Sequence, residues 1–86
     1  MARFISLHTL ACLTRQGAEE LTLRMARATS VRMRRVVVNL YQGKMLVEFE
    51  AEKRELLEAW MTEQKFHYDW LMRVELVSEG EALRSV

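Results

Sequence analysis

The stretch RVVVNLYQGKMLVEFEA, residues 35–51, decides the fold of this chain. It opens with three consecutive valines, and β-branched side chains of this kind are typical of strands. Beyond the turn Tyr41–Lys44, residues 45–51 place alternate side chains on two faces, which indicates a second strand. Gly43 can adopt the positive φ that a tight turn requires. Because the turn is short, the two strands are predicted to pair as an antiparallel hairpin.

On the N-terminal side of this hairpin, the sequence indicates a strand over residues 3–10 and a helix over 15–29. Thr14 is the predicted N-cap of that helix, since its hydroxyl can accept an unpaired backbone N–H. The strand alternates, so one face carries Phe4, Ser6, His8 and Leu10, and the other carries Ile5, Leu7 and Thr9. Both faces are partly apolar, which predicts that both are covered.

On the C-terminal side, residues 52–64 have the apolar stripe of an amphipathic helix, and residues 71–77 indicate a fourth strand. The resulting order is β-α-β-β-α-β, the ferredoxin-like arrangement of the α+β class. We expect one domain over residues 1–78 and a polar, frayed tail over 79–86. With both helices on one face of the sheet, the other face would expose Phe4 and His8. A second copy would cover it, as in a dimeric α/β barrel, so a homodimer is predicted.

Composition excludes several classes of protein. The 86 residues carry a net charge of +1 with 29% charged side chains, so no overall positive charge favours nucleic acid. No apolar run approaches the roughly 20 residues of a membrane span, and no secretory leader is expected. The single cysteine excludes an internal disulfide and favours the cytoplasm. Charge is uneven, because residues 1–47 hold eight Lys or Arg and two acids, whereas residues 48–86 hold five bases and ten acids.

Four side chains are candidate metal ligands, namely His8, Cys12, His67 and Asp69. An imidazole four residues before a thiol suits zinc, nickel or copper, although no second pair follows at a recognisable spacing. Asp69 could orient His67 for ligand or base chemistry. The alternatives are a hydrogen-bonded structural histidine and an inert cysteine. The aromatic residues around His67 favour either a pocket for a flat ligand or ordinary packing.

Two sets of charged residues are candidates for a functional role. Glu48 and Glu50 share a strand face and suit ligation or acid–base chemistry, or simply a solvent-exposed face. A basic cluster could bind phosphate; it comprises Arg24, Arg27, Arg32, Arg34 and Arg35. The strands lack the aromatic motifs that RNA-binding versions of this fold use. No nucleophile elbow, phosphate loop or Cys-x-x-Cys pair is present.

Several stretches together resemble a family of small bacterial proteins typified by a nickel-binding protein. They are MARFISLH at 1–8, the helix after Leu13–Thr14, FEA at 49–51 and YDWLMRV at 68–74. The resemblance implies a ferredoxin-like homodimer that binds Ni²⁺, with His8 at the position of the family's first-strand histidine.

The chain departs from the nickel-binding pattern at four positions. Thr9 stands where the pattern has a second histidine, Glu52 where it has a proline, and Val47 where it can have a cysteine. His67 matches the late histidine only after a one-residue shift.

Three functions follow as hypotheses. The first is a nickel-type metal-binding homodimer in which His8 is the central ligand, with His67, Asp69 and Cys12 as helpers. The second is a cofactor-free enzyme of the dimeric α/β-barrel kind, a monooxygenase or an isomerase, with His8 or His67 as the base. The third is an interaction module without a ligand site.

Overall fold

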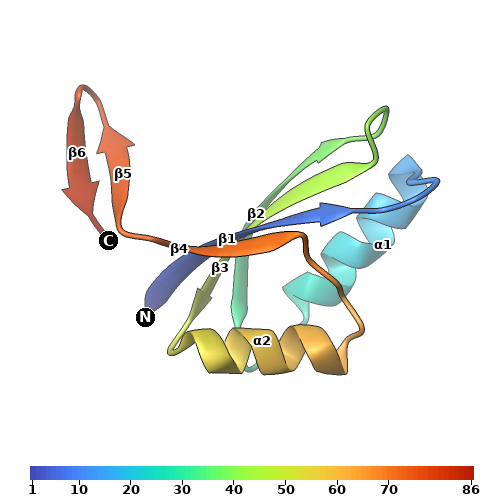
Figure 1. Cartoon of the computed structure of the whole chain (residues 1–86), viewed down its shortest axis with the longest axis horizontal. Helices are drawn as coiled ribbons and strands as arrows, with labels where there is room; N and C mark the ends of the chain where they lie inside the picture. Colours follow the sequence, from blue (N-terminus) through green and yellow to red (C-terminus); the bar gives the residue numbers. More distant parts are fainter.

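The computed structural model describes residues 1–86 and shows an α+β protein with two helices and two antiparallel sheets. The elements, in chain order, are β1 (Ala2–Thr9), α1 (Arg15–Ala26), β2 (Arg32–Asn39), β3 (Lys44–Ala51), α2 (Arg54–Glu63), β4 (Trp70–Val74), β5 (Leu76–Glu79) and β6 (Ala82–Ser85). Strands β1 to β4 form the main sheet, and β5 and β6 form a separate hairpin (Figure 1). The predicted β-α-β-β-α-β order is confirmed, whereas the hairpin was not foreseen.

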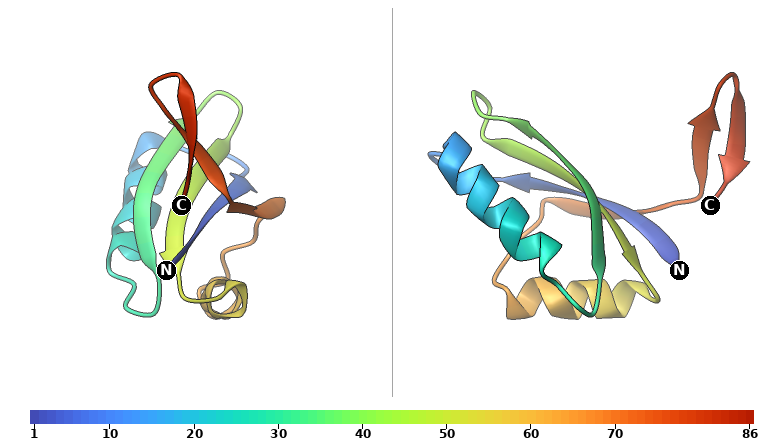
Figure 2. Two further views of the ribbon diagram at one scale, coloured as in Figure 1. Left: turned by 90° about the vertical axis from the view of Figure 1, so that its left-hand side faces the viewer. Right: turned by 180° about the vertical axis from the view of Figure 1, so that it is seen from behind.

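The main sheet has the spatial order β2-β3-β1-β4, and every neighbouring pair is antiparallel. Each parallel pair, β1 with β2 and β3 with β4, is therefore separated by one strand, and one helix makes each crossover. Both helices lie on the same side of the sheet (Figure 2). The opposite side, which we call the open face, has no helix over it. Neither helix has the length and apolarity that a membrane span requires.

The central turn depends on Gly43. Its φ is +66°, and a Cβ added there would lie 2.6 Å from the Leu10 carbonyl oxygen. The Leu10 N–H in turn donates to the Gly43 carbonyl at 2.8 Å. The same glycine therefore closes the β2–β3 hairpin and fixes the end of β1. The predicted hairpin is confirmed, and β2 contains an irregularity between Met33 and Arg35 that the sequence did not reveal.

The core lies between the sheet and the helices. Phe4, Met45, Val47 and Phe49 point from the sheet into this layer, and Leu57, Trp60 and Met61 of α2 meet them. Phe49 and Trp60 pack edge to face with ring centroids 5.6 Å apart. Thr14 caps α1 as predicted, because its Oγ1 accepts the Gly17 N–H at 3.0 Å.

Two sequence-based expectations are wrong. Phe4 and His8 were expected on the open face, but they face the helices and are buried, as is Ser6 between them. The alternation of β1 was recognised correctly, yet both of its faces carry apolar residues, so the pattern did not indicate which one is covered. The expected frayed tail is the β5–β6 hairpin. Gly80, with φ +64°, begins its two-residue loop, as a tight hairpin requires, and the surrounding polar side chains hid this signal.

Candidate functional site

His8 is sealed in the core by three neighbours. Its Nε2 lies 2.7 Å from Ser6 Oγ, and its Nδ1 lies 2.7 Å from the His67 carbonyl oxygen. The ring stacks on Phe66 with centroids 3.9 Å apart and an interplanar angle of 14°. Because a carbonyl only accepts, Nδ1 carries the proton, and Nε2 accepts the hydroxyl hydrogen of Ser6. Both ring nitrogens are therefore occupied within the fold, and the side chain is 0% exposed.

This environment keeps the imidazole neutral near pH 7. Burial lowers the pKa of His8 from its ordinary value of 6.5, and the bond to the His67 carbonyl and the charge of Asp69 only partly oppose that effect. A neutral imidazole with one donor and one acceptor matches the two partners that surround it. His8 lines none of the five main clefts, so a substrate does not reach it in this conformation.

The other predicted ligands do not gather around His8. The side chain of His67 is exposed, and only its backbone carbonyl meets His8. Asp69 is exposed and accepts a hydrogen bond from the Thr9 hydroxyl. Cys12 lies exposed in the loop between β1 and α1, with a positive φ of 54°.

No group of three or more His, Cys, Asp or Glu side chains is arranged to hold a metal ion. The donors of a single chain therefore do not fit a nickel centre, because the predicted central ligand has no free nitrogen. Nickel binding stays a prediction, and it would require ligands from a second copy.

The aromatic residues after α2 take part in packing. Phe66 is buried against His8, and the Tyr68 hydroxyl donates to Glu58 at 3.3 Å. Trp70 is different, because it lies on the open face and is 42% exposed. None of these three residues lines a main cleft, and the contacts of Phe66 and Tyr68 agree with the packing alternative.

The open face carries a contiguous group of apolar side chains that the sequence analysis did not assign. In the strand register, Leu46 lies between Val37 and Leu7, and Trp70 lies beside Leu7. Ile5 and Met72 form the next pair along β1 and β4. We call these six residues the apolar patch: Ile5, Leu7, Val37, Leu46, Trp70 and Met72. In the sequence, the second apolar face of β1 was the pattern that could have indicated this patch.

One end of the open face is rich in charge. Arg34 donates to Glu50 at 2.5 Å, and Arg35 donates to Glu48 at 3.0 Å. The hydrogen bond from Arg34, with smaller contributions from the charges of Arg32 and Arg3, holds the pKa of Glu50 below its ordinary value. We call Arg3, Arg32, Arg34 and Arg35 the arginine row. Arg3 and Arg32 have no ion-pair partner, and Glu48 and Glu50 are each paired with an arginine rather than with each other.

The opposite end of the open face has a short polar relay. Lys44 donates to Thr9 Oγ1 at 3.0 Å, and Thr9 donates to Asp69.

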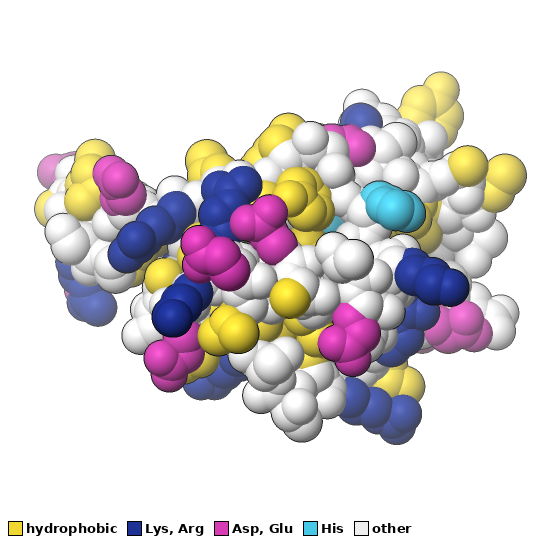
Figure 3. Space-filling model, turned by 60° about the horizontal axis from the view of Figure 1, so that its bottom comes forward, with side chains coloured by type: hydrophobic (Ala, Val, Ile, Leu, Met, Phe, Trp, Pro, Cys, Tyr) yellow, Lys and Arg dark blue, Asp and Glu magenta, His cyan; other side chains and the backbone are white.

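The predicted basic cluster is divided, because Arg24 of α1 instead donates to the Gln64 carbonyl on the helical side at 3.2 Å. Figure 3 shows acidic and basic side chains mixed over that helical side.

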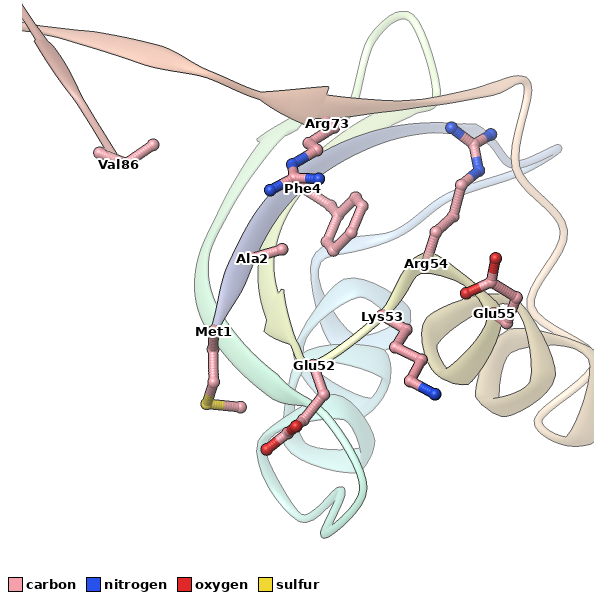
Figure 4. A pocket seen from close by; sticks show the side chains of 9 residues that line it. All are labelled: Met1, Ala2, Phe4, Glu52, Lys53, Arg54, Glu55, Arg73 and Val86. Carbon is pink, nitrogen blue, oxygen red and sulfur yellow. The ribbon is translucent and has the colours of Figure 1, made fainter.

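The largest cleft lies at the start of α2 and has a volume of about 740 Å³ (Figure 4). Phe4 forms part of its wall, and the side chains of Lys53, Arg54 and Arg73 surround it. Lys53 occupies the N-cap position without a side-chain capping bond. Arg54 pairs with Glu58 at 3.1 Å, so part of the positive charge is neutralised. The cleft holds no predicted ligand or base.

No protein-family model, curated protein or solved structure matches this chain.

Proposed function

We propose that this protein is a ferredoxin-like homodimer, in which two copies pack their open faces together in the manner of a dimeric α/β barrel. The observation that carries the proposal is the apolar patch. On an antiparallel sheet with one covered face, the uncovered face is normally polar. Here one row of outward positions across all four strands is apolar, namely Val37, Leu46, Leu7 and Trp70. Val37 is 45% exposed, Trp70 42% and Met72 49%.

A second copy suits this surface for reasons of shape and charge. The patch extends across the full width of a sheet, and another sheet is the partner that packs flat against such a surface. Nucleic acid is a poorer partner, since Arg34 and Arg35 are already paired with carboxylates. Trp70 is the one aromatic residue in the patch, which gives little stacking area for bases.

The proposed role is assembly, and it accounts for the sealed state of His8. Of the four candidate ligands only His8 lies in the core, where it is hydrogen-bonded, whereas the apolar patch on the open face is uncovered. We further propose a cytoplasmic location, because the exposed Cys12 thiol stays reduced there.

Sedimentation equilibrium of the full chain tests the dimer. We expect the unmodified protein to sediment as a dimer at micromolar concentration. Val37→Glu with Met72→Glu places two charges in the patch at positions that are 45% and 49% exposed, so a single chain tolerates them. We expect this variant to be monomeric at the same concentration.

The matched control makes the same change on the helical side. Leu23→Glu with Leu56→Glu alters positions that are 51% and 41% exposed, and it should leave the dimer intact. A monomeric unmodified protein, or equal behaviour of the two double variants, would refute the proposal.

A further inference from the structure

The β5–β6 hairpin, residues 76–85, projects from the end of β4 and stands away from the sheet and helices (Figures 1 and 2). We call this hairpin the arm. Beyond its own ladder, the arm has a hydrogen bond from Arg84 to Glu79 at 2.8 Å. The residues that flank it are also joined, because the Val86 N–H donates to the Glu75 carbonyl at 3.1 Å. No hydrogen bond joins the arm to the rest of the chain. No hydrogen bond from the main sheet or the helices therefore holds the arm in place.

The arm has two chemically different faces. Its register places Leu76 opposite Ser85 and Leu83 opposite Ser78, so both leucines lie on one face. The other face carries the Arg84–Glu79 ion pair together with Val77 and Ala82, and Val77 is half-buried. Leu76 is 51% exposed and Leu83 is 68% exposed. The leucine face is thus an unpartnered apolar surface.

Such an arm needs a partner to remain folded. Each of its strands has four residues, and an isolated two-stranded hairpin is marginally stable at best in water. Packing the leucine face on another surface would supply the missing contacts. Glu75 is the single residue between β4 and β5, whereas a chain reversal takes a loop of at least two residues. In the structure the arm accordingly continues outward from β4 and does not lie on its own open face (Figures 1 and 2).

We propose that the arm of each protomer packs its leucine face against the partner's open face, next to the arginine row. This inference rests on the homodimer proposed above and names the segment that completes its interface. Charge supports the placement, because Glu79 is paired with Arg84, whereas Glu75 and Glu81 are acids of residues 75–86 that have no ion-pair partner within the chain. Arg3 and Arg32 of the partner's row have no ion-pair partner within their own chain.

Two variants of the full chain test the arm by sedimentation equilibrium. Leu76→Ser with Leu83→Ser removes the apolar contacts of the leucine face. We expect at least a tenfold rise in the dimer dissociation constant. The matched control, Val77→Ser with Ala82→Ser, changes the opposite face of the arm and should shift the constant less than twofold.

Cross-linking shows which chain the arm contacts. Ser78→Cys on the leucine face and Arg32→Cys in the arginine row are combined with Cys12→Ser, and the protein is treated with a short bismaleimide. We expect a covalent dimer on denaturing gels. A cross-link within one chain would overturn the inference, because the arm would then lie on its own sheet.

Failure of this inference can be distinguished from failure of the dimer. If the unmodified protein dimerises, Val37→Glu with Met72→Glu abolishes the dimer, and the leucine variant dimerises normally, the open-face dimer stands and the arm has no part in it. If the unmodified protein is monomeric at every concentration, both proposals fall.

Discussion

The two faces of β1 differ in what their side chains do, although both are partly apolar. On the inner face, Ser6 and His8 satisfy each other and are completely buried. On the outer face, Ile5 and Leu7 belong to the apolar patch, which nothing in the chain covers. The comparison shows that a residue with a reactive side chain can have a structural role in the core, while ordinary aliphatic residues form the surface through which we propose that the protein dimerises.

The largest effect of any substitution should be on the dimer dissociation constant, when charge is introduced on the outer face of the sheet. Val37→Glu with Met72→Glu should raise the dimer dissociation constant by more than 100-fold, because carboxylates would be buried without partners. Concentration-dependent light scattering measures this constant. A shift as small as that of Leu23→Glu with Leu56→Glu would remove the distinction between the outer face and the helical side.

The next largest effect should come from the buried histidine. His8→Ala leaves a cavity and unpairs the Ser6 hydroxyl and the His67 carbonyl, so the free energy of unfolding should fall by about 3 kcal/mol. Urea denaturation measures it. His67→Ala is the matched control, since that side chain is exposed and only its carbonyl is used, and the change should stay within about 0.5 kcal/mol. Equal losses in the two variants would show that His8 is not the structural histidine.

Two hydroxyl groups on opposite faces of β1 give a finer comparison. Ser6→Ala leaves Nε2 of His8 without its donor in the core, which should cost about 1–2 kcal/mol of unfolding free energy. Thr9→Ala removes an exposed hydroxyl that bonds Lys44 and Asp69, and it should cost less than about 0.5 kcal/mol. Thermal and urea unfolding report both values. A reversed ranking would mean that the polar relay, rather than the buried pair, stabilises the strand.

The smallest effect should appear in the dependence of stability on pH. Because the folded state lowers the pKa of His8 from 6.5, the unfolded chain binds more protons in the window just below that value. Stability is therefore full above pH 6.5 and declines as the pH falls toward the folded-state pKa. The depressed pKa of Glu50 adds a second decline, which begins near 4.5, its ordinary value. In urea titrations at different pH values, His8→Gln should abolish the first decline in stability and keep the second. If the first decline persists in this variant, a group other than His8 causes it.

The sequence predicted the order and type of the first six elements because their signals are local. The hairpin was readable from three valines, a short turn and Gly43, and Thr14 was recognisable as an N-cap. The orientation of β1 was not readable, since Phe4 and Ile5 give both faces an apolar residue. Only the register with β3, in which Phe4 lies opposite the buried Phe49, determines the inner face.

The candidate site was predicted less well for a related reason. His8 was singled out by residue type, but its partners are a carbonyl 59 residues away and a ring from the segment after α2. No spacing within the sequence encodes those contacts. The arm was missed because its four-residue strands contain Ser, Glu and Arg, so Leu76 and Leu83 did not stand out as a shared face.

The accessibility of Trp70 tests the central claim most directly. Trp60→Phe leaves Trp70, which is 42% exposed on the open face, as the only tryptophan, and acrylamide quenching of its fluorescence is measured from nanomolar to high micromolar protein. If two open faces pack together, quenching falls as the concentration rises, and Val37→Glu with Met72→Glu removes that fall. If quenching of Trp70 is the same at every concentration while the protein stays folded, the open face is not covered by a second copy and the account is contradicted.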